Sequence, residues 1–120
     1  FRSSAGLPIF VGRSNRQNDR LTTRTAEKWD LWFHTQKIHG SHVILSTSGE
    51  QPDAQSIAEA ASLAAYFSQA QSSTKVPVDF TQVKFVKKPA AAKPGMVVYT
   101  NYQTVLADPN EELVKHLLVK

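Results

Sequence analysis

The sequence predicts a single compact α+β domain: a mostly antiparallel sheet of about six or seven strands, two long helices and a short C-terminal helix. Three observations predict it: interleaved strand and helix signals, two long stretches without Pro or Gly, and no internal repeat. The 120 residues, 41% of them hydrophobic, suffice for one core. The expected elements, in order, are a hairpin over 1–3 and 7–11, a helix over 15–28, strands over 29–36 and 41–47, a helix over 53–71, a strand over 78–86, strands over 96–100 and 103–106, and a helix over 110–118.

Local turn and capping signals define the first elements. Gly6 can take the positive φ of a tight turn, so the residues on either side of it are expected to form a hairpin. Ser14 and Gln17 have the spacing of a capping box, and no Pro or Gly interrupts the helical stretch that follows. Aromatic and β-branched residues then dominate two stretches separated by a turn at residues 37–40, which predicts two strands.

The second half of the chain is punctuated by proline. Pro52 stands where it can open the second helix, whose alanines at helical spacing favour close packing on a sheet. The strand over residues 78–86 slips once in its alternation, which indicates a bulge. The last two strands are close enough in the sequence to form another hairpin, and Pro109 then opens the final helix.

Composition excludes several kinds of protein. Without any cysteine there is no disulfide, no thiolate nucleophile and no cysteine zinc site. No run approaches the roughly 18 to 20 apolar residues of a membrane helix, and the start of the sequence has no signal-peptide pattern. We therefore expect a cytoplasmic chain without a membrane partner. Because the sequence has no initiator Met, we interpret residues 1–120 as one domain of a longer protein.

Basic charge is concentrated in two segments. Residues 1–42 carry seven basic and three acidic side chains, and residues 75–93 carry five and one, so each segment has a net charge of +4 while the remainder has −4. Clustered Lys and Arg displace the counterions of phosphates, which favours a polyanion bound on one side. Lys84, Lys87 and Lys88 are expected to point outward and contact phosphates. The alternative is a solvated basic surface with no partner.

A stripe of basic residues is predicted along the first helix. Its arginines recur every four residues, which puts them on one face, and guanidinium groups suit phosphate oxygens. Free backbone N–H groups at the start of the helix would add to phosphate binding. The alternative is that these arginines pair with the nearby carboxylates of Asp19 and Glu27 on an ordinary solvated face. The stripe comprises Arg13, Arg16, Arg20, Arg24 and Lys28.

The stretch Asp30-Leu31-Trp32-Phe33-His34 combines aromatic and polar side chains in one expected strand. Alternation would send Leu31 and Phe33 to one face of the sheet and Trp32 and His34 to the other. An exposed Trp32 would stack on unpaired bases, a contact worth roughly 1 to 3 kcal/mol per base. The alternative is that a helix covers Trp32 and makes it part of the core.

Histidines also raise the question of a metal. His34, His39 and His42 lie close together in the sequence and near Asp30, but their spacing matches neither a helical HExxH motif nor a zinc finger. The many Ser and Thr residues lack a nucleophile motif. We therefore expect no metal, no cofactor and no enzymatic activity.

Several stretches taken together resemble a known family. They are Gly6–Thr22, Asp30–His34 and Gly40–Val43, followed by the stretches at residues 76–81, 83–84, 86–89 and 93–95. In their order and spacing the chain resembles, over nearly its whole length, the NFACT-R domain of the RqcH/NEMF ribosome-quality-control family, and its later stretches are similar to the bacterial branch.

The resemblance implies an RNA-contacting part of a large multi-domain protein. Such proteins bind obstructed large ribosomal subunits together with tRNA, and the bacterial ones direct alanine tailing of stalled nascent chains. The implied partners are tRNA, the rRNA of the large subunit and other domains of the same full-length protein, and the implied location is the ribosome. An older family name, fibronectin-binding protein, leaves a surface adhesin domain as the alternative.

The family motif, carried over residue by residue, points to positions that flank the arginine stripe. Asp19 and Asp30 are expected to be partly structural, Asp19 by holding the first helix against an arginine and Asp30 by orienting His34. The motif positions are Asn15, Asn18, Asp19, Asp30, Trp32, His34, Ser41 and His42.

Overall fold

A central sheet separates two layers of different composition. The computed structural model describes residues 1–119. Lys120, which was counted in the net charge of −4 outside the two basic segments, lies outside the described residues. The α+β class and the mostly antiparallel sheet are confirmed. The elements are β1 (Ile9–Val11), α1 (Asn15–Arg20), a π-helical segment (Leu21–Thr25), β2 (Leu31–Thr35), β3 (Val43–Leu45), α2 (Ala54–Tyr66), β4 (Val76–Gln82), a 3₁₀ turn (Val83–Phe85), β5 (Val86–Lys87), β6 (Val98–Tyr99), β7 (Gln103–Ala107) and α3 (Glu111–Leu117).

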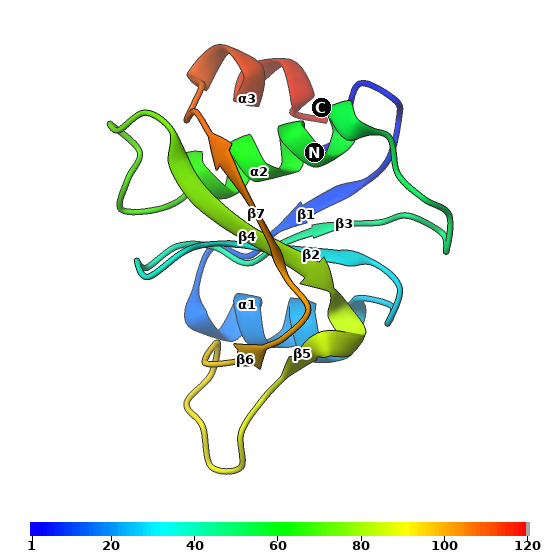
Figure 1. Cartoon of the computed structure of the whole chain (residues 1–120), viewed down its shortest axis with the longest axis vertical. Helices are drawn as coiled ribbons and strands as arrows, with labels where there is room; N and C mark the ends of the chain where they lie inside the picture. Colours follow the sequence, from blue (N-terminus) through cyan, green and yellow to red (C-terminus); the bar gives the residue numbers. More distant parts are fainter. Residues whose placement is uncertain (120) are drawn as a thin grey trace.

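The main sheet has the strand order β1-β3-β2-β4-β7, and every neighbouring pair is antiparallel. Figure 1 shows α2 and α3 on one face of this sheet, and α1 with the small β5–β6 sheet on the other. The predicted strands on either side of residues 37–40 are confirmed as β2 and β3, in which Phe33 lies opposite Val43. As the middle strand, β2 has neighbours on both sides, and Trp32, Phe33 and Thr35 are buried.

The larger core lies between α2 and the sheet. Alanines at helical spacing line the buried face of α2 and let the helix approach the sheet closely, as predicted. The prediction that this helix continues to Gln71 is wrong. After Tyr66 the chain instead pairs with the turn before β3, where Phe67 accepts a hydrogen bond from the Ser41 N–H at 2.9 Å and Gln69 donates one to the His39 carbonyl at 3.0 Å. These bonds are incompatible with a further helical turn.

The first helix begins as predicted and ends early. Ser14 caps it by accepting a hydrogen bond from the Gln17 N–H at 3.1 Å. After the π-helical segment, the chain leaves the helix at Ala26 instead of continuing to residue 28. The cause is Asp30, whose carboxylate accepts hydrogen bonds from the backbone N–H groups of Glu27 and Thr47 at 2.9 and 3.2 Å. Asp30 thus shapes the turn before β2, and the expectation that it orients His34 is wrong.

Strand pairing differs from the prediction at both ends of the chain. The expected hairpin of the last two strands is wrong, because β6 pairs with β5 and β7 pairs with β4. The slip in the fourth strand is a 3₁₀ turn and not a bulge. That turn carries the chain out of the main sheet to the face covered by α1. The first hairpin is reduced to one bridge between Arg2 and Pro8, and β1 pairs with β3 instead.

A smaller, aromatic interior lies on the α1 side of the sheet. Trp32 is 1% exposed, so the expectation that it is exposed is wrong and the alternative that it belongs to the core is confirmed, with a ring from the strand β6, and not the expected helix, packed against it. The alternation of β2 is as predicted, but β6 covers this face and brings the Tyr99 ring to 4.7 Å from that of Trp32, centroid to centroid. The rings of His42 and His34 lie 5.4 and 5.8 Å away. Within the described residues, the Trp32 Nε1 has no hydrogen-bond partner.

Trp32→Ala is expected to lower the free energy of unfolding by about 3 to 5 kcal/mol, because it removes a fully buried aromatic side chain. Urea denaturation followed by circular dichroism measures this loss. Trp29→Ala is the matched control, and it is expected to cost less than half as much because Trp29 is 39% exposed. Equal losses in the two variants would contradict the interior position of Trp32.

Candidate nucleic-acid interface

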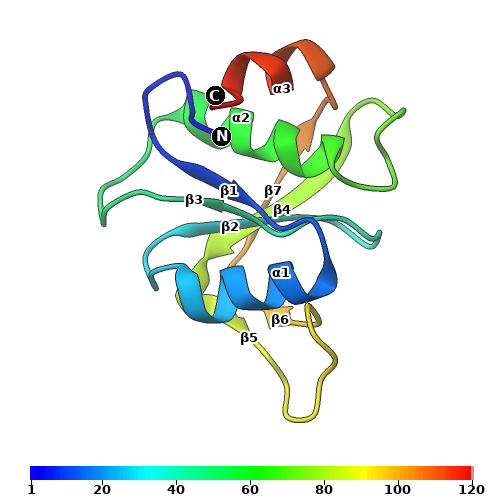
Figure 2. The same cartoon turned by 180° about the vertical axis from the view of Figure 1, so that it is seen from behind.

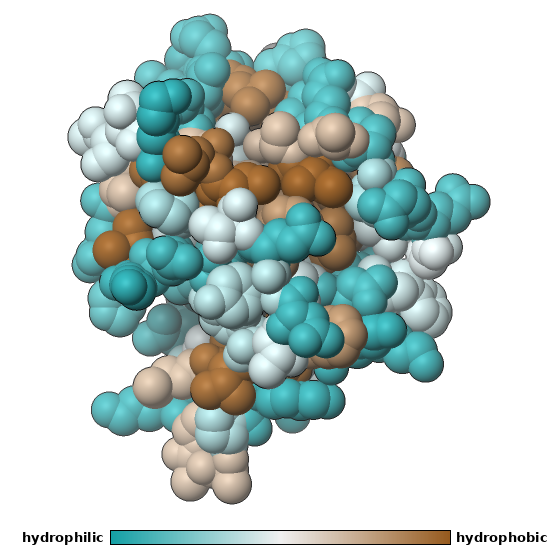
Figure 3. All heavy atoms as spheres, in the orientation of Figure 1, coloured by the Kyte–Doolittle hydropathy of each residue, from teal (hydrophilic) through white to brown (hydrophobic). Residues whose placement is uncertain are grey.

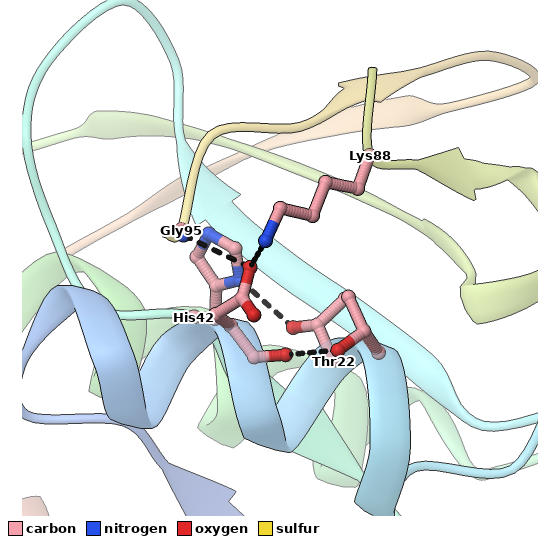
Figure 4. Close-up of polar contacts among 6 residues, drawn as sticks. Thr22, His42, Lys88 and Gly95 are labelled. Atoms are coloured by element: carbon pink, nitrogen blue, oxygen red, sulfur yellow. Dashed lines mark hydrogen bonds and ion pairs between the residues drawn. The ribbon is translucent and has the colours of Figure 1, made fainter. Parts of the chain in front are cut away.

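One carboxylate joins the two basic segments. Asp19 of α1 lies 2.8 Å from the Lys88 Nζ and accepts a hydrogen bond from the Gly95 N–H at 3.2 Å, contacts that are drawn in Figure 4. The Lys88 and Gly95 hydrogen bonds lower the pKa of Asp19, so it stays charged at neutral pH. Gly95 has φ +82°, and a Cβ there would lie 3.2 Å from the Asn15 carbonyl oxygen. Asp19 therefore has a structural role, as expected, but its partner is a lysine and not an arginine.

A second contact fixes the two segments further along. The Lys84 N–H donates a hydrogen bond to the Lys28 carbonyl at 3.0 Å, so the 3₁₀ turn runs beside Lys28, the last residue of the basic stripe. Figure 2, seen from behind, shows α1 and the β5–β6 sheet together beneath the main sheet. The exposed cations of these elements therefore lie in one layer. They are Arg13, Arg16, Arg20, Arg24, Lys28, Lys84, Lys87, Lys88 and Lys93.

The arginines of the helix are exposed and free of carboxylates. Among residues 1–119 the only ion pair is the one between Lys88 and Asp19, so the alternative in which the stripe pairs with Asp19 and Glu27 is wrong. Arg13 lies over the Phe67 ring, 4.3 Å from its centroid, a cation–π contact. Not all N–H groups at the helix start are free, because the Gln17 Oε1 accepts from the Arg13 N–H at 2.8 Å. The Arg13 and Gln17 N–H groups are thus occupied, and the exposed guanidinium groups are the positive charges that this helix presents to solvent.

Six of the eight family-motif residues, all but Asp19 and Asp30, line two adjoining pockets of about 410 Å³ each. The pockets meet at His39 and Gln69, which line both. The first is lined by the predicted residues Arg13, Asn15, Asn18 and Ser41, and the second by Trp32, His34 and His42. Phe67 and Tyr99 also line them and were missed, because each comes from an element distant in the sequence with no motif of its own.

Several motif residues are buried and hold the site together. Asn18 and His42 are 6% and 2% exposed, and the Asn18 Oδ1 accepts a hydrogen bond from the His42 N–H at 3.0 Å. The Gly12 N–H donates to the His42 carbonyl, also at 3.0 Å. The Thr22 hydroxyl lies 2.8 Å from the His42 Nδ1 (Figure 4). These bonds fix the start of β3 against the first helix, so the side chains position the surface and do not form it. Ser41 is buried as well.

The two histidines of the aromatic interior are uncharged at neutral pH. Burial, together with the nearby His34 ring, lowers the pKa of His42 to about 4. Burial likewise lowers the pKa of His34. Beside them, the buried Asp79 carboxylate accepts hydrogen bonds from the Tyr99 and Thr104 hydroxyls and from the Gln36 side chain, at 2.5, 2.6 and 3.1 Å. Desolvation and the Asp79 contact raise the pKa of Tyr99. The histidines therefore add no positive charge to the interface.

Two further findings concern the described residues. Residues 1–119 contain no group of three or more His, Cys, Asp or Glu side chains arranged to hold a metal ion. No helix among them has the length and apolar character needed to cross a bilayer.

The free energy of unfolding is expected to decrease as the pH falls from 6.5 to 4. The His42 pKa is about 4 in the folded chain and about 6.5 in the unfolded chain, so protons bind preferentially to the unfolded chain in this interval. The stability present above pH 6.5 is lost progressively, by roughly 3 kcal/mol in total. Urea denaturation across this range measures it. His42→Gln is expected to make the pH dependence shallower, with the remainder coming from His34, and an unchanged slope in that variant would contradict the assignment to His42.

Comparison with known proteins shows the family of this chain. A family model described as the NFACT protein RNA binding domain matches residues 1–101. The chain belongs to the NFACT RNA-binding domain family, as its sequence motifs indicated.

Within that family the chain is similar to bacterial relatives. It is 51% identical over 114 residues to the Rqc2 homolog RqcH of Bacillus subtilis, covering 95% of this chain and 20% of the relative. It is 42% identical over 111 residues to the Rqc2 homolog RqcH of Streptococcus suis, covering 92% and 20%. A solved structure, the C-terminal part of the fibronectin/fibrinogen-binding protein from Streptococcus suis, matches with TM-score 0.94 and 39% identity, covering 98% of this chain and 47% of that one. The chain spans about one fifth of the length of its curated relatives.

Proposed function

We propose that this chain is an RNA-binding module, without enzymatic activity of its own, that contacts tRNA and the rRNA of the large ribosomal subunit. The observation that carries the proposal is the convergence of cations from both basic segments on one layer, where the helix presents arginines free of ion pairs among the described residues. Membership of a family described as RNA-binding, and relatives named as RqcH, support it.

Within a longer protein, the module would serve ribosome-associated quality control in the cytoplasm. It would bind obstructed large subunits together with other domains of the same protein and support alanine tailing of stalled nascent chains. Because the chain spans about one fifth of its relatives, tailing would require the rest of the protein.

Polar groups of the interior support a binding role over a catalytic one. The Asp79 carboxylate is 1% exposed and already accepts three hydrogen bonds, so it is a poor general base. His42 is 2% exposed and its Nδ1 is engaged by Thr22. Most of the exposed charged side chains of this layer are cations, which suit the electrostatic binding of a phosphate backbone.

Affinity for tRNA is expected to fall steeply with salt, because about four to six phosphates are neutralised. The log of the association constant against the log of salt concentration should have a slope of roughly −3 to −5. Arg20→Ala should weaken binding and make the slope shallower by about one unit at most. Fluorescence anisotropy with labelled tRNA measures both quantities.

Arg2→Ala is the matched control, since it removes the same charge from the opposite layer, where the Arg2 N–H donates to the Leu117 carbonyl of α3. It should leave the slope unchanged. A flat salt dependence, or equal effects of both substitutions, would refute the electrostatic interface. Fibronectin is the competing ligand, favoured by the description of the similar solved structure. Binding of fibronectin but not tRNA by the same preparation would favour the adhesin alternative.

A further inference from the structure

A third pocket lies where the stripe of basic residues ends. It has a volume of about 370 Å³ and is formed by four segments: residues 29–31 at the start of β2, residues 49–57 from the loop after β3 into α2, residues 80–85 at the end of β4, and residues 101–103 at the start of β7. Its lining is of two kinds. Apolar and aromatic walls come from Trp29, Leu31, Phe80 and Phe85, and amide side chains come from Gln51, Gln82, Asn101 and Gln103. None of these eight residues belongs to the interface predicted from the sequence.

Trp29 gives this pocket an aromatic surface that solvent reaches. Its side chain is 39% exposed, whereas Trp32 is buried. The backbone around it is fixed, because the Trp29 carbonyl accepts a hydrogen bond from the Thr47 hydroxyl at 3.3 Å and Asp30 holds the adjoining turn. Base stacking needs such an exposed and well-positioned ring.

The size and polarity of the pocket suit a flat, polar ring. Its volume is at the lower end of the range for small-molecule sites, roughly 300 to 1,000 Å³, and accommodates one nucleobase. Amide side chains both donate and accept hydrogen bonds, as the edges of nucleobases do. Asn and Gln pair with adenine in this way. An aromatic wall beside several amides is therefore complementary to an unpaired base.

Cations flank the pocket on the side of the helix. Lys28 and Lys84 are exposed, joined through their backbones at 3.0 Å, and each precedes an aromatic residue of the pocket wall. They stand where the phosphates next to a bound base would lie. Glu50 also lines the pocket, and its negative charge disfavours entry of a phosphate while its carboxylate can accept from an exocyclic amine.

We propose that this pocket is a subsite for one unpaired nucleobase of a bound RNA. Trp29 stacks on the base, the amide side chains contact its edge, and Lys28 and Lys84 bind the adjacent phosphates. This inference rests on the proposed RNA-binding function and identifies a single-stranded nucleotide as part of the ligand. In contrast, the apolar patch over β7 and α2, brown in Figure 3, has no cation among its lining residues.

Tryptophan fluorescence of the 120-residue chain tests the subsite. A ten-nucleotide single-stranded RNA is expected to quench the emission, and a blunt duplex of the same sequence is expected to quench it far less, because duplex bases cannot enter the pocket. Trp29→Leu should abolish the quenching and weaken single-strand binding by about 5- to 100-fold. Trp29→Phe should retain most of the affinity, since a phenyl ring still stacks.

Gln103→Leu provides a second variant, because Gln103 is exposed and lines the pocket. It should weaken single-strand binding without lowering the melting temperature. If Trp29→Leu and Gln103→Leu both leave single-strand affinity unchanged while Arg20→Ala weakens RNA binding, the subsite is refuted. The proposed RNA-binding function would still hold in that case. Equal quenching by the duplex and the single strand would also overturn it. So would binding of millimolar AMP in the pocket that the single-stranded RNA fails to displace. No binding of any RNA by the unmodified chain would refute the proposed function itself.

Discussion

The contacts of Asp19 determine how the rest of the interface is arranged. This carboxylate receives Lys88 and the Gly95 N–H from a loop 76 residues further along the chain and so holds that loop against α1. The loop in turn positions β6, whose Tyr99 covers Trp32. Because the Lys88 charge is neutralised by Asp19, the remaining cations of this layer carry its net positive charge. One partly buried ion pair thus creates a common basic layer from two separate segments and closes the aromatic interior beneath it.

Burial divides the site residues predicted from the sequence into two groups. Arg13, Asn15 and the arginines of the helix are exposed, while Asn18, Trp32, Ser41 and His42 lie inside. The inner group is uncharged at neutral pH and bonded to backbone and neighbouring rings, so its chemistry is that of a scaffold. The family motif therefore includes residues that hold this surface in shape as well as residues exposed on it.

Local signals in the sequence predicted what depends on near neighbours. The Ser14 cap, the start of α2 and the alternation along β2 follow from capping, proline placement and side-chain period. Pairing of β7 with β4 and of β6 with β5 was not predictable, because alternation says which face a side chain takes and not which strand lies beside it. For the same reason, the face of the sheet on which Trp32 lies was predicted correctly, but the strand that covers it, β6, was not. The pocket at Trp29 was missed because its walls come from four separate segments.

The central claim is that RNA lies on the layer formed by α1 and the β5–β6 sheet. Crosslinking the chain to tRNA and mapping the adducts by mass spectrometry tests it most directly. The predicted result is a set of adducts concentrated on residues 13–28 and 84–93, within the two segments that Asp19 joins, and on Trp29 of the proposed subsite beside them. Adducts concentrated on α2, α3 and β7, on the opposite face of the sheet, would contradict it.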